Sequence, residues 1–67
     1  MNITLNNKPE SFEQDSLSVS EVLKVKRFTF KLLVIKINGK LIRKPEYESS
    51  FVKDGDDLQI IHMISGG

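Results

Sequence analysis

The residues with the most distinctive chemistry are the three at positions 65–67, Ser65, Gly66 and Gly67. Gly67 would present a free α-carboxylate. Because glycine lacks a Cβ, two glycines can lie in a narrow channel with backbone angles that other residues avoid. Such a carboxylate can attack the α-phosphate of ATP, and the acyl-adenylate that forms is activated toward a sulfur nucleophile. The pattern therefore predicts a chain on which partner enzymes act, with Gly67 as the reacting residue. The alternative is a tail without a function, which we weigh lower because an apolar segment leads directly into Ser65.

Other groupings that could do chemistry are weak. The chain has no cysteine and a single histidine, which excludes disulfides, thiolate metal sites and histidine-pair metal sites. His62 stands between Ile61 and Met63 and is interpreted as a half-exposed strand residue. The run 54–57, Asp-Gly-Asp-Asp, lacks the spaced ligands of a calcium loop and is interpreted as an acidic turn. No phosphate-loop spacing occurs, so we expect the chain itself to bind no cofactor or metal.

Length and charge limit the class of protein. A chain of 67 residues forms one small domain, whose thin core leaves little room for a deep enzyme pocket. The net charge is +1 with both signs interspersed, which gives no drive toward nucleic acid or membranes. The local basic cluster is interpreted as a solvated helix end; it consists of Lys24, Lys26, Arg27 and Lys31. No secretory or membrane-spanning segment is recognised, so we expect a cytoplasmic or organelle-stroma protein that is monomeric when free.

The first segment of the chain predicts a hairpin. Apolar residues alternate over 2–6, which is typical of a strand with one buried face. The residues 6–9, Asn-Asn-Lys-Pro, predict a turn, because Asn tolerates left-handed backbone and Pro fixes φ. A return strand is then predicted over 10–14, with Phe12 facing inward.

A helix is predicted next. The residues from Ser18 to Glu21 match a capping box, in which each of these two side chains accepts a hydrogen bond from the other residue's backbone N–H. Leu17 before the cap and Val22 after it are placed for a hydrophobic staple. The apolar spacing that follows predicts a helix over 19–27.

The second half of the chain predicts three further strands. The β-branched run 33–37 indicates a central strand, and Asn38-Gly39 is typical of a tight hairpin turn. We predict a partner strand at 41–43, one helical turn at 46–50, and a last strand at 58–64.

These elements follow the order ββαβββ, which predicts an α+β domain with one helix packed across one face of a sheet. The candidate core residues are Leu5, Val22, Leu23, Val34 or Ile35, Leu58 and Ile60. If Leu58 and Ile60 face the helix, then Gln59, Ile61 and Met63 face away. Two apolar side chains on an open face beside the tail predict a partner-binding patch, which consists of Ile61, Met63 and the adjoining Ser65.

The chain resembles the ThiS family. The opening Met1-Asn2-Ile3 and the Asn6-Asn7 turn carry part of the resemblance, together with the segment 37–42, Ile-Asn-Gly-Lys-Leu-Ile. The most specific block is 52–58, Val-Lys-Asp-Gly-Asp-Asp-Leu, followed by the ending Ile-Ser-Gly-Gly at 64–67. One departure is that Arg43 and Lys44 stand where the family often has Pro then Arg. A second is that the chain is slightly basic, which bears on how a partner docks rather than on the carboxyl chemistry.

The resemblance implies a β-grasp (ubiquitin-like) fold, with a mixed sheet of four to five strands on one helix. The carrier domain would span 1–64 and a flexible tail 65–67. It further implies that an E1-like enzyme of the ThiF type adenylates Gly67 using ATP and Mg²⁺. The product is converted to a thiocarboxylate with sulfur from a donor protein. A thiazole synthase of the ThiG type then takes the sulfur to build the thiazole ring of thiamine.

Three other functions share parts of this pattern. The small subunit of molybdopterin synthase has the same fold and ending but donates sulfur to a pterin precursor, and it is usually longer. In a ubiquitin-like modifier, a lysine amine rather than sulfur attacks the terminal glycine. A β-grasp binding module would carry the tail without using it.

Overall fold

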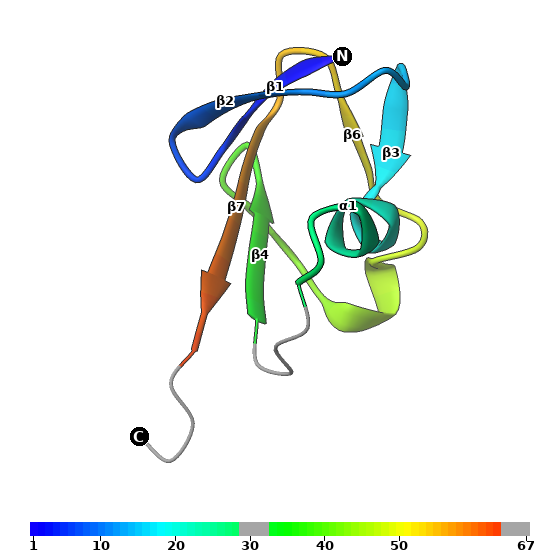
Figure 1. Ribbon diagram of the computed structural model, residues 1–67. Helices are drawn as coiled ribbons and strands as arrows, with labels where there is room; N and C mark the ends of the chain where they lie inside the picture. Colours follow the sequence, from blue (N-terminus) through cyan, green and yellow to red (C-terminus); the bar gives the residue numbers. More distant parts are fainter. Residues whose placement is uncertain (29–32, 64–67) are drawn as a thin grey trace.

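The computed structural model describes residues 1–28 and 33–63. Its main sheet has five strands in the spatial order β2-β1-β7-β4-β5 (Figure 1). β1 and β7 run parallel, and the other neighbours are antiparallel, so the sheet is mixed as predicted. The strands are β1 (Asn2–Leu5), β2 (Lys8–Ser11), β4 (Leu33–Ile37), β5 (Lys40–Ile42) and β7 (Asp57–His62).

Helix α1 (Val19–Val25) packs across one face of this sheet. The predicted capping box is confirmed: Ser18 Oγ accepts from the Glu21 N–H at 3.1 Å, and Glu21 Oε1 accepts from the Ser18 N–H at 2.9 Å. The predicted end at Arg27 is wrong by two residues. Arg27 has φ of 59°, and the N–H of Phe28 donates to the carbonyl of Leu23, which closes a Schellman motif. The sequence gives no glycine at this position to mark the end.

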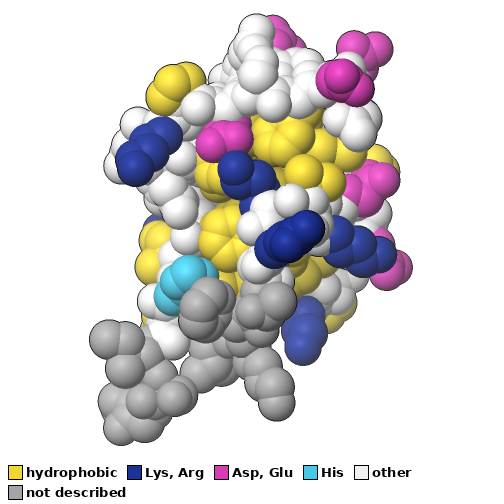
Figure 2. Space-filling view, viewed as in Figure 1, with side chains coloured by type: hydrophobic (Ala, Val, Ile, Leu, Met, Phe, Trp, Pro, Cys, Tyr) yellow, Lys and Arg dark blue, Asp and Glu magenta, His cyan; other side chains and the backbone are white. Residues whose placement is uncertain are grey.

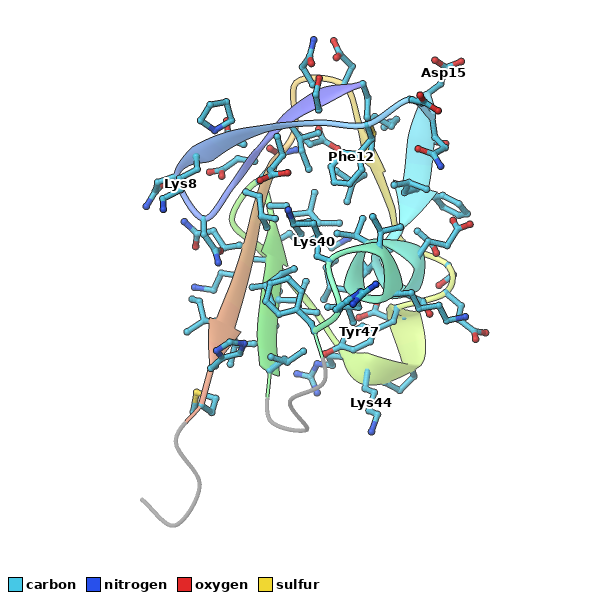
Figure 3. All side chains as sticks on the ribbon, viewed as in Figure 1. Lys8, Phe12, Asp15, Lys40, Lys44 and Tyr47 are labelled. Carbon is cyan, nitrogen blue, oxygen red and sulfur yellow. The ribbon has the colours of Figure 1, made fainter. Side chains whose placement is uncertain are left out.

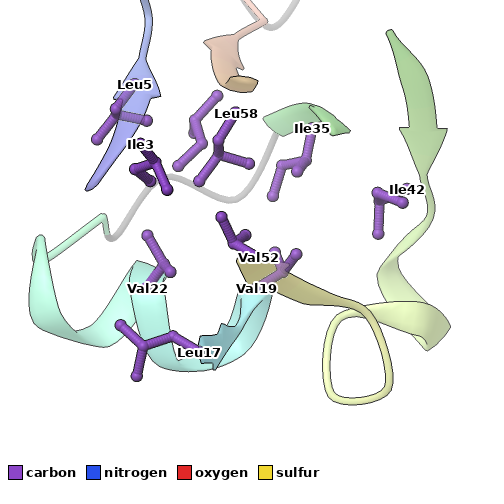
Figure 4. Close-up of a cluster of buried hydrophobic side chains, with 10 residues drawn as sticks. Ile3, Leu5, Leu17, Val19, Val22, Ile35, Ile42, Val52 and Leu58 are labelled. Carbon is purple, nitrogen blue, oxygen red and sulfur yellow. The ribbon is translucent and has the colours of Figure 1, made fainter. Parts of the chain in front are cut away.

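The core lies between the helix and the sheet. Figure 4 shows side chains from the sheet strands facing those of α1 and its neighbours across a single apolar layer. Of the predicted core residues, Leu23 is only partly buried, and Ile35 rather than Val34 points inward. Phe12 is partly buried against the core, as predicted. The buried side chains are Ile3, Leu5, Leu17, Val19, Val22, Ile35, Ile42, Val52, Leu58 and Ile60.

Two short strands are missing from the predicted order ββαβββ. β3 (Ser16–Ser18) and β6 (Phe51–Lys53) pair antiparallel in a separate two-stranded sheet. Each has three residues, too few to show a period of two. The helical turn predicted at 46–50 is present, because the Ser50 N–H donates to the Glu46 carbonyl at 2.9 Å, and it follows the 3₁₀ helix η1 (Lys44–Glu46), which was not predicted.

The first hairpin is tighter than predicted. Asn6 and Asn7 both have positive φ, 51° and 69°, as a two-residue turn of type I′ requires. The return strand β2 therefore starts at Lys8 rather than at residue 10. Pro9 is tolerated there because β2 is an edge strand of the sheet.

Candidate functional site

Strand β7 is the element that leads toward the predicted reactive end. It lies between β1 and β4, and Figure 1 shows it ending at the opposite end of the molecule from Met1. Met63 is the last residue that the structure describes. Ser65, Gly66 and Gly67 lie outside the described residues, so their predicted roles stay predictions.

The start of β7 is held by side chains from two turns. Asn38 Oδ1 accepts from the Asp57 N–H at 2.9 Å, and Asn38 Nδ2 donates to Asp56 Oδ1 at 3.0 Å. Asp56 Oδ2 accepts from the Lys53 N–H at 2.9 Å. The Asn-Gly turn and the acidic turn are therefore one structural unit. The described residues contain no His/Asp/Glu cluster suited to a metal ion.

The two faces of β7 differ in burial as predicted. Leu58 and Ile60 are 0% and 3% exposed, whereas Ile61 and Met63 are 44% and 55% exposed. Gln59, on the same face as Ile61, is half-buried. Replacing Ile61 is therefore expected to leave the core intact, and the side chain is available to a partner.

Neighbouring strands extend this apolar surface. Val34 of β4 pairs with Ile61 of β7. On the same face, Lys36 of β4 lies between Gln59 of β7 and Leu41 of β5, and these three residues form a second row. Leu41 is 47% exposed. We call Val34, Leu41, Ile61 and Met63 the open-face patch. Sequence reasoning missed Leu41, although the two-residue turn at 38–39 fixes its register against Lys36.

A hollow of about 490 Å³ adjoins this patch. Among the described residues that line it are the cations Arg43 and Lys44 and no carboxylate. Figure 3 shows Lys44 and Tyr47 toward the end of the molecule where β7 ends. The other described lining residues are Leu33, Val34, Leu41, Ile42, Pro45, Tyr47 and Met63. A partner that fits here would combine apolar groups with acidic ones.

The face drawn in Figure 2 carries both acidic and basic side chains. Lys26 Nζ lies 3.0 Å from Glu10 Oε1, with both side chains about one-third exposed, and such surface pairs contribute little. Lys24, Lys26 and Arg27 are exposed around the end of α1, as predicted; Lys31 lies outside the described residues.

His62 is an exposed residue at the end of β7, in agreement with its interpretation as a half-exposed strand residue. It stacks edge-to-face on Phe28, with ring centroids 5.7 Å apart. None of the helices in the described residues has the length and apolar character to cross a membrane.

Comparison with known proteins decides the family. The sequence profile of the ThiS family matches residues 3–67. The chain belongs to the ThiS family. It is 25% identical over 65 residues to the sulfur carrier protein ThiS of Bacillus subtilis, covering 97% of this chain and 98% of that protein.

Solved ThiS structures have the same fold. The crystal structure of the thiamine biosynthesis protein ThiS from Geobacter metallireducens matches with a TM-score of 0.90 at 29% identity, over the full length of both chains. The solution structure of a thiamine biosynthesis protein from the same organism matches with a TM-score of 0.81 at 29% identity, covering all of this chain and 88% of that one. The predicted β-grasp fold is thereby confirmed. As a ThiS-family member, the chain is classed with the small sulfur carriers of thiamine biosynthesis.

Proposed function

We propose that the carboxylate of Gly67 is the group that carries sulfur. An E1-like enzyme of the ThiF type binds ATP and Mg²⁺, and a carboxylate oxygen of Gly67 attacks the α-phosphorus, releasing pyrophosphate. A persulfide sulfur of a donor protein then displaces AMP. A thiol cleaves the resulting acyl disulfide, which leaves a thiocarboxylate on Gly67 and a disulfide on the donor side. A thiazole synthase of the ThiG type takes the sulfur from this thiocarboxylate.

The observation that carries this proposal is the match to the ThiS family over residues 3–67, a range that includes Gly66 and Gly67. The relatives found are thiamine biosynthesis proteins, which supports a thiamine carrier over a pterin-pathway carrier. A protein whose described residues form a thin core with an open apolar face is suited to being handled by partners rather than to catalysis.

The open-face patch is the proposed docking surface for both partner enzymes. Ile61 lies on β7 and Met63 follows the end of that strand, so an enzyme that binds these two side chains is also close in sequence to residues 65–67. A methionine side chain is flexible and polarizable, which suits a surface that meets two different partners in turn.

Intact-mass measurement tests the proposal. The chain is incubated with a ThiF-type enzyme, ATP, Mg²⁺ and a sulfur donor, and the mass should rise by the replacement of one oxygen by sulfur. Fragmentation should place the change on Gly67. A chain that stays unmodified while a known ThiS carrier is converted under the same conditions would refute the proposal.

A further inference from the structure

The side chain of Asn6, in the turn that follows β1, holds the backbone of β7. Asn6 Nδ2 donates to the carbonyl oxygen of Ile60 at 3.0 Å, and Asn6 Oδ1 accepts from the N–H of Ile60 at 2.8 Å. Both backbone polar groups of Ile60 are thus bonded by one carboxamide, across 54 residues of sequence. We call this arrangement the Asn6 clamp.

The clamp adds two hydrogen bonds to the β1–β7 ladder, beyond the point where the backbone of β1 leaves β7. β1 pairs with β7 at Thr4–Asp57 and Leu5–Leu58, and the backbone N–H of Asn6 still donates to the Leu58 carbonyl at 3.0 Å. The chain then turns at Asn6 into β2. A carboxamide offers the same donor and acceptor as a peptide group, so the Asn6 side chain replaces the strand residue that would otherwise face Ile60.

The turn does not by itself require these bonds. Asn6 has φ of 51°, a conformation that glycine adopts without strain and Asn tolerates. Asn7 has φ of 69° in the same turn, and its side chain makes no bond to Ile60. The carboxamide of Asn6 therefore serves β7 rather than the turn.

We propose that Asn6 is a positioning residue for the sulfur-carrier reaction. Resting on the proposed function above, the clamp fixes the strand at Ile60, seven residues before Gly67, and so sets the point from which the reactive end reaches a partner's active site. Each residue left unordered before docking must be ordered during docking, which weakens binding. Because the clamp already orders Ile60 in the free protein, less conformational entropy is lost when the partner docks.

Asn6→Gly isolates the effect, because it keeps the left-handed backbone and removes the carboxamide. Amide hydrogen exchange should speed up at Ile60 and much less at Gln59 and Ile61, whose N–H groups alternate toward β4. With a ThiF-type enzyme, kcat/KM for the carrier should fall about tenfold, chiefly through a higher KM, because the partner must now order more chain. Loss of stability alone would not raise KM once the folded fraction is matched by circular dichroism.

Two further variants complete the experiment. Asn7→Gly changes the same turn without touching the clamp, and should match the wild type in exchange and in KM. Asn6→Asp keeps the acceptor for the Ile60 N–H but loses the donor, so its KM should also rise; it provides a second test if Asn6→Gly does not fold.

The outcomes separate this inference from the function on which it rests. Faster exchange at Ile60 with an unchanged KM in both Asn6 variants would overturn the positioning role alone. An equal rise of KM in Asn7→Gly would also overturn it, since the turn and not the clamp would then matter. A wild-type chain that the enzyme never converts would overturn the proposed function and this inference together.

Discussion

Placing a glutamate at Ile61 tests whether the open-face patch docks the activating enzyme. Full burial of an isoleucine contributes about 1.5–3 kcal/mol. Ile61 still exposes 44% of its surface, so a partner that covers it gains roughly 1 kcal/mol. A carboxylate there forfeits this gain and, when desolvated without a partner, adds about 1–3 kcal/mol of cost. The sum of about 2–4 kcal/mol predicts a fall in kcat/KM of about 30-fold or more, since 1.4 kcal/mol is a factor of ten.

The assay follows thiocarboxylate formation by intact mass at several carrier concentrations, alongside urea unfolding. Ile61→Ala loses only the apolar term, so kcat/KM should fall about fivefold. Ile60→Ala is the matched control on the buried face: Ile60 is 3% exposed, and its truncation should lower the free energy of unfolding by about 2–5 kcal/mol. A folded Ile61→Glu variant converted at the wild-type rate would refute the docking role, and an unfolded one would show that Ile61 belongs to the core.

Three further predictions concern the tail, the helix cap, and the cations Arg43 and Lys44 that line the hollow. One uncleaved residue added after Gly67 should abolish thiocarboxylate formation without changing the melting temperature, because it removes the reacting carboxylate; full conversion of the extended chain would contradict the mechanism. Ser18→Ala should lower the free energy of unfolding by about 1 kcal/mol in urea titrations at an unchanged m-value; no loss would mean that the cap contributes nothing. Replacing both Arg43 and Lys44 by Glu should slow association with the activating enzyme most at low salt. Lys8→Glu, on the edge strand β2, is the control for the Arg43 and Lys44 replacements. If it slows association equally, then acidic groups of the enzyme do not contact Arg43 and Lys44 specifically.

The predictable parts of the fold are those with strong local signals. The capping box at Ser18 and Glu21 and the turn at Asn38-Gly39 are fixed by side-chain chemistry within a few residues, and both are confirmed. The alternation of apolar residues predicted which side chains of β7 point into the core and which point outward, and their burial confirms it.

What could not be predicted depends on contacts between distant segments. β3 and β6 are three residues each, and they pair where Leu17 and Val52 lie opposite each other in the core. The Asn6 clamp joins residues 54 positions apart, so in the sequence Asn6 reads only as a turn residue. The turn at 38–39 places Leu41 opposite Lys36, but the position of Leu41 in the same patch as Ile61 depends on β4 lying beside β7, which requires the sheet order to be known.

Strand β7 divides two tasks between alternate residues. Its inward side chains, Leu58 and Ile60, lie in the core, and its backbone is held by Asn38 at the start and by Asn6 at Ile60. Its outward side chain Ile61 keeps 44% of its surface exposed, and in the proposed function a partner covers that surface. Because a small domain has few core residues to spare, this alternation would let one strand both stabilise the body and present the docking surface proposed above. It follows that substitutions at the outward positions of β7 can change the contacts with a partner without disturbing the buried side chains of the same strand.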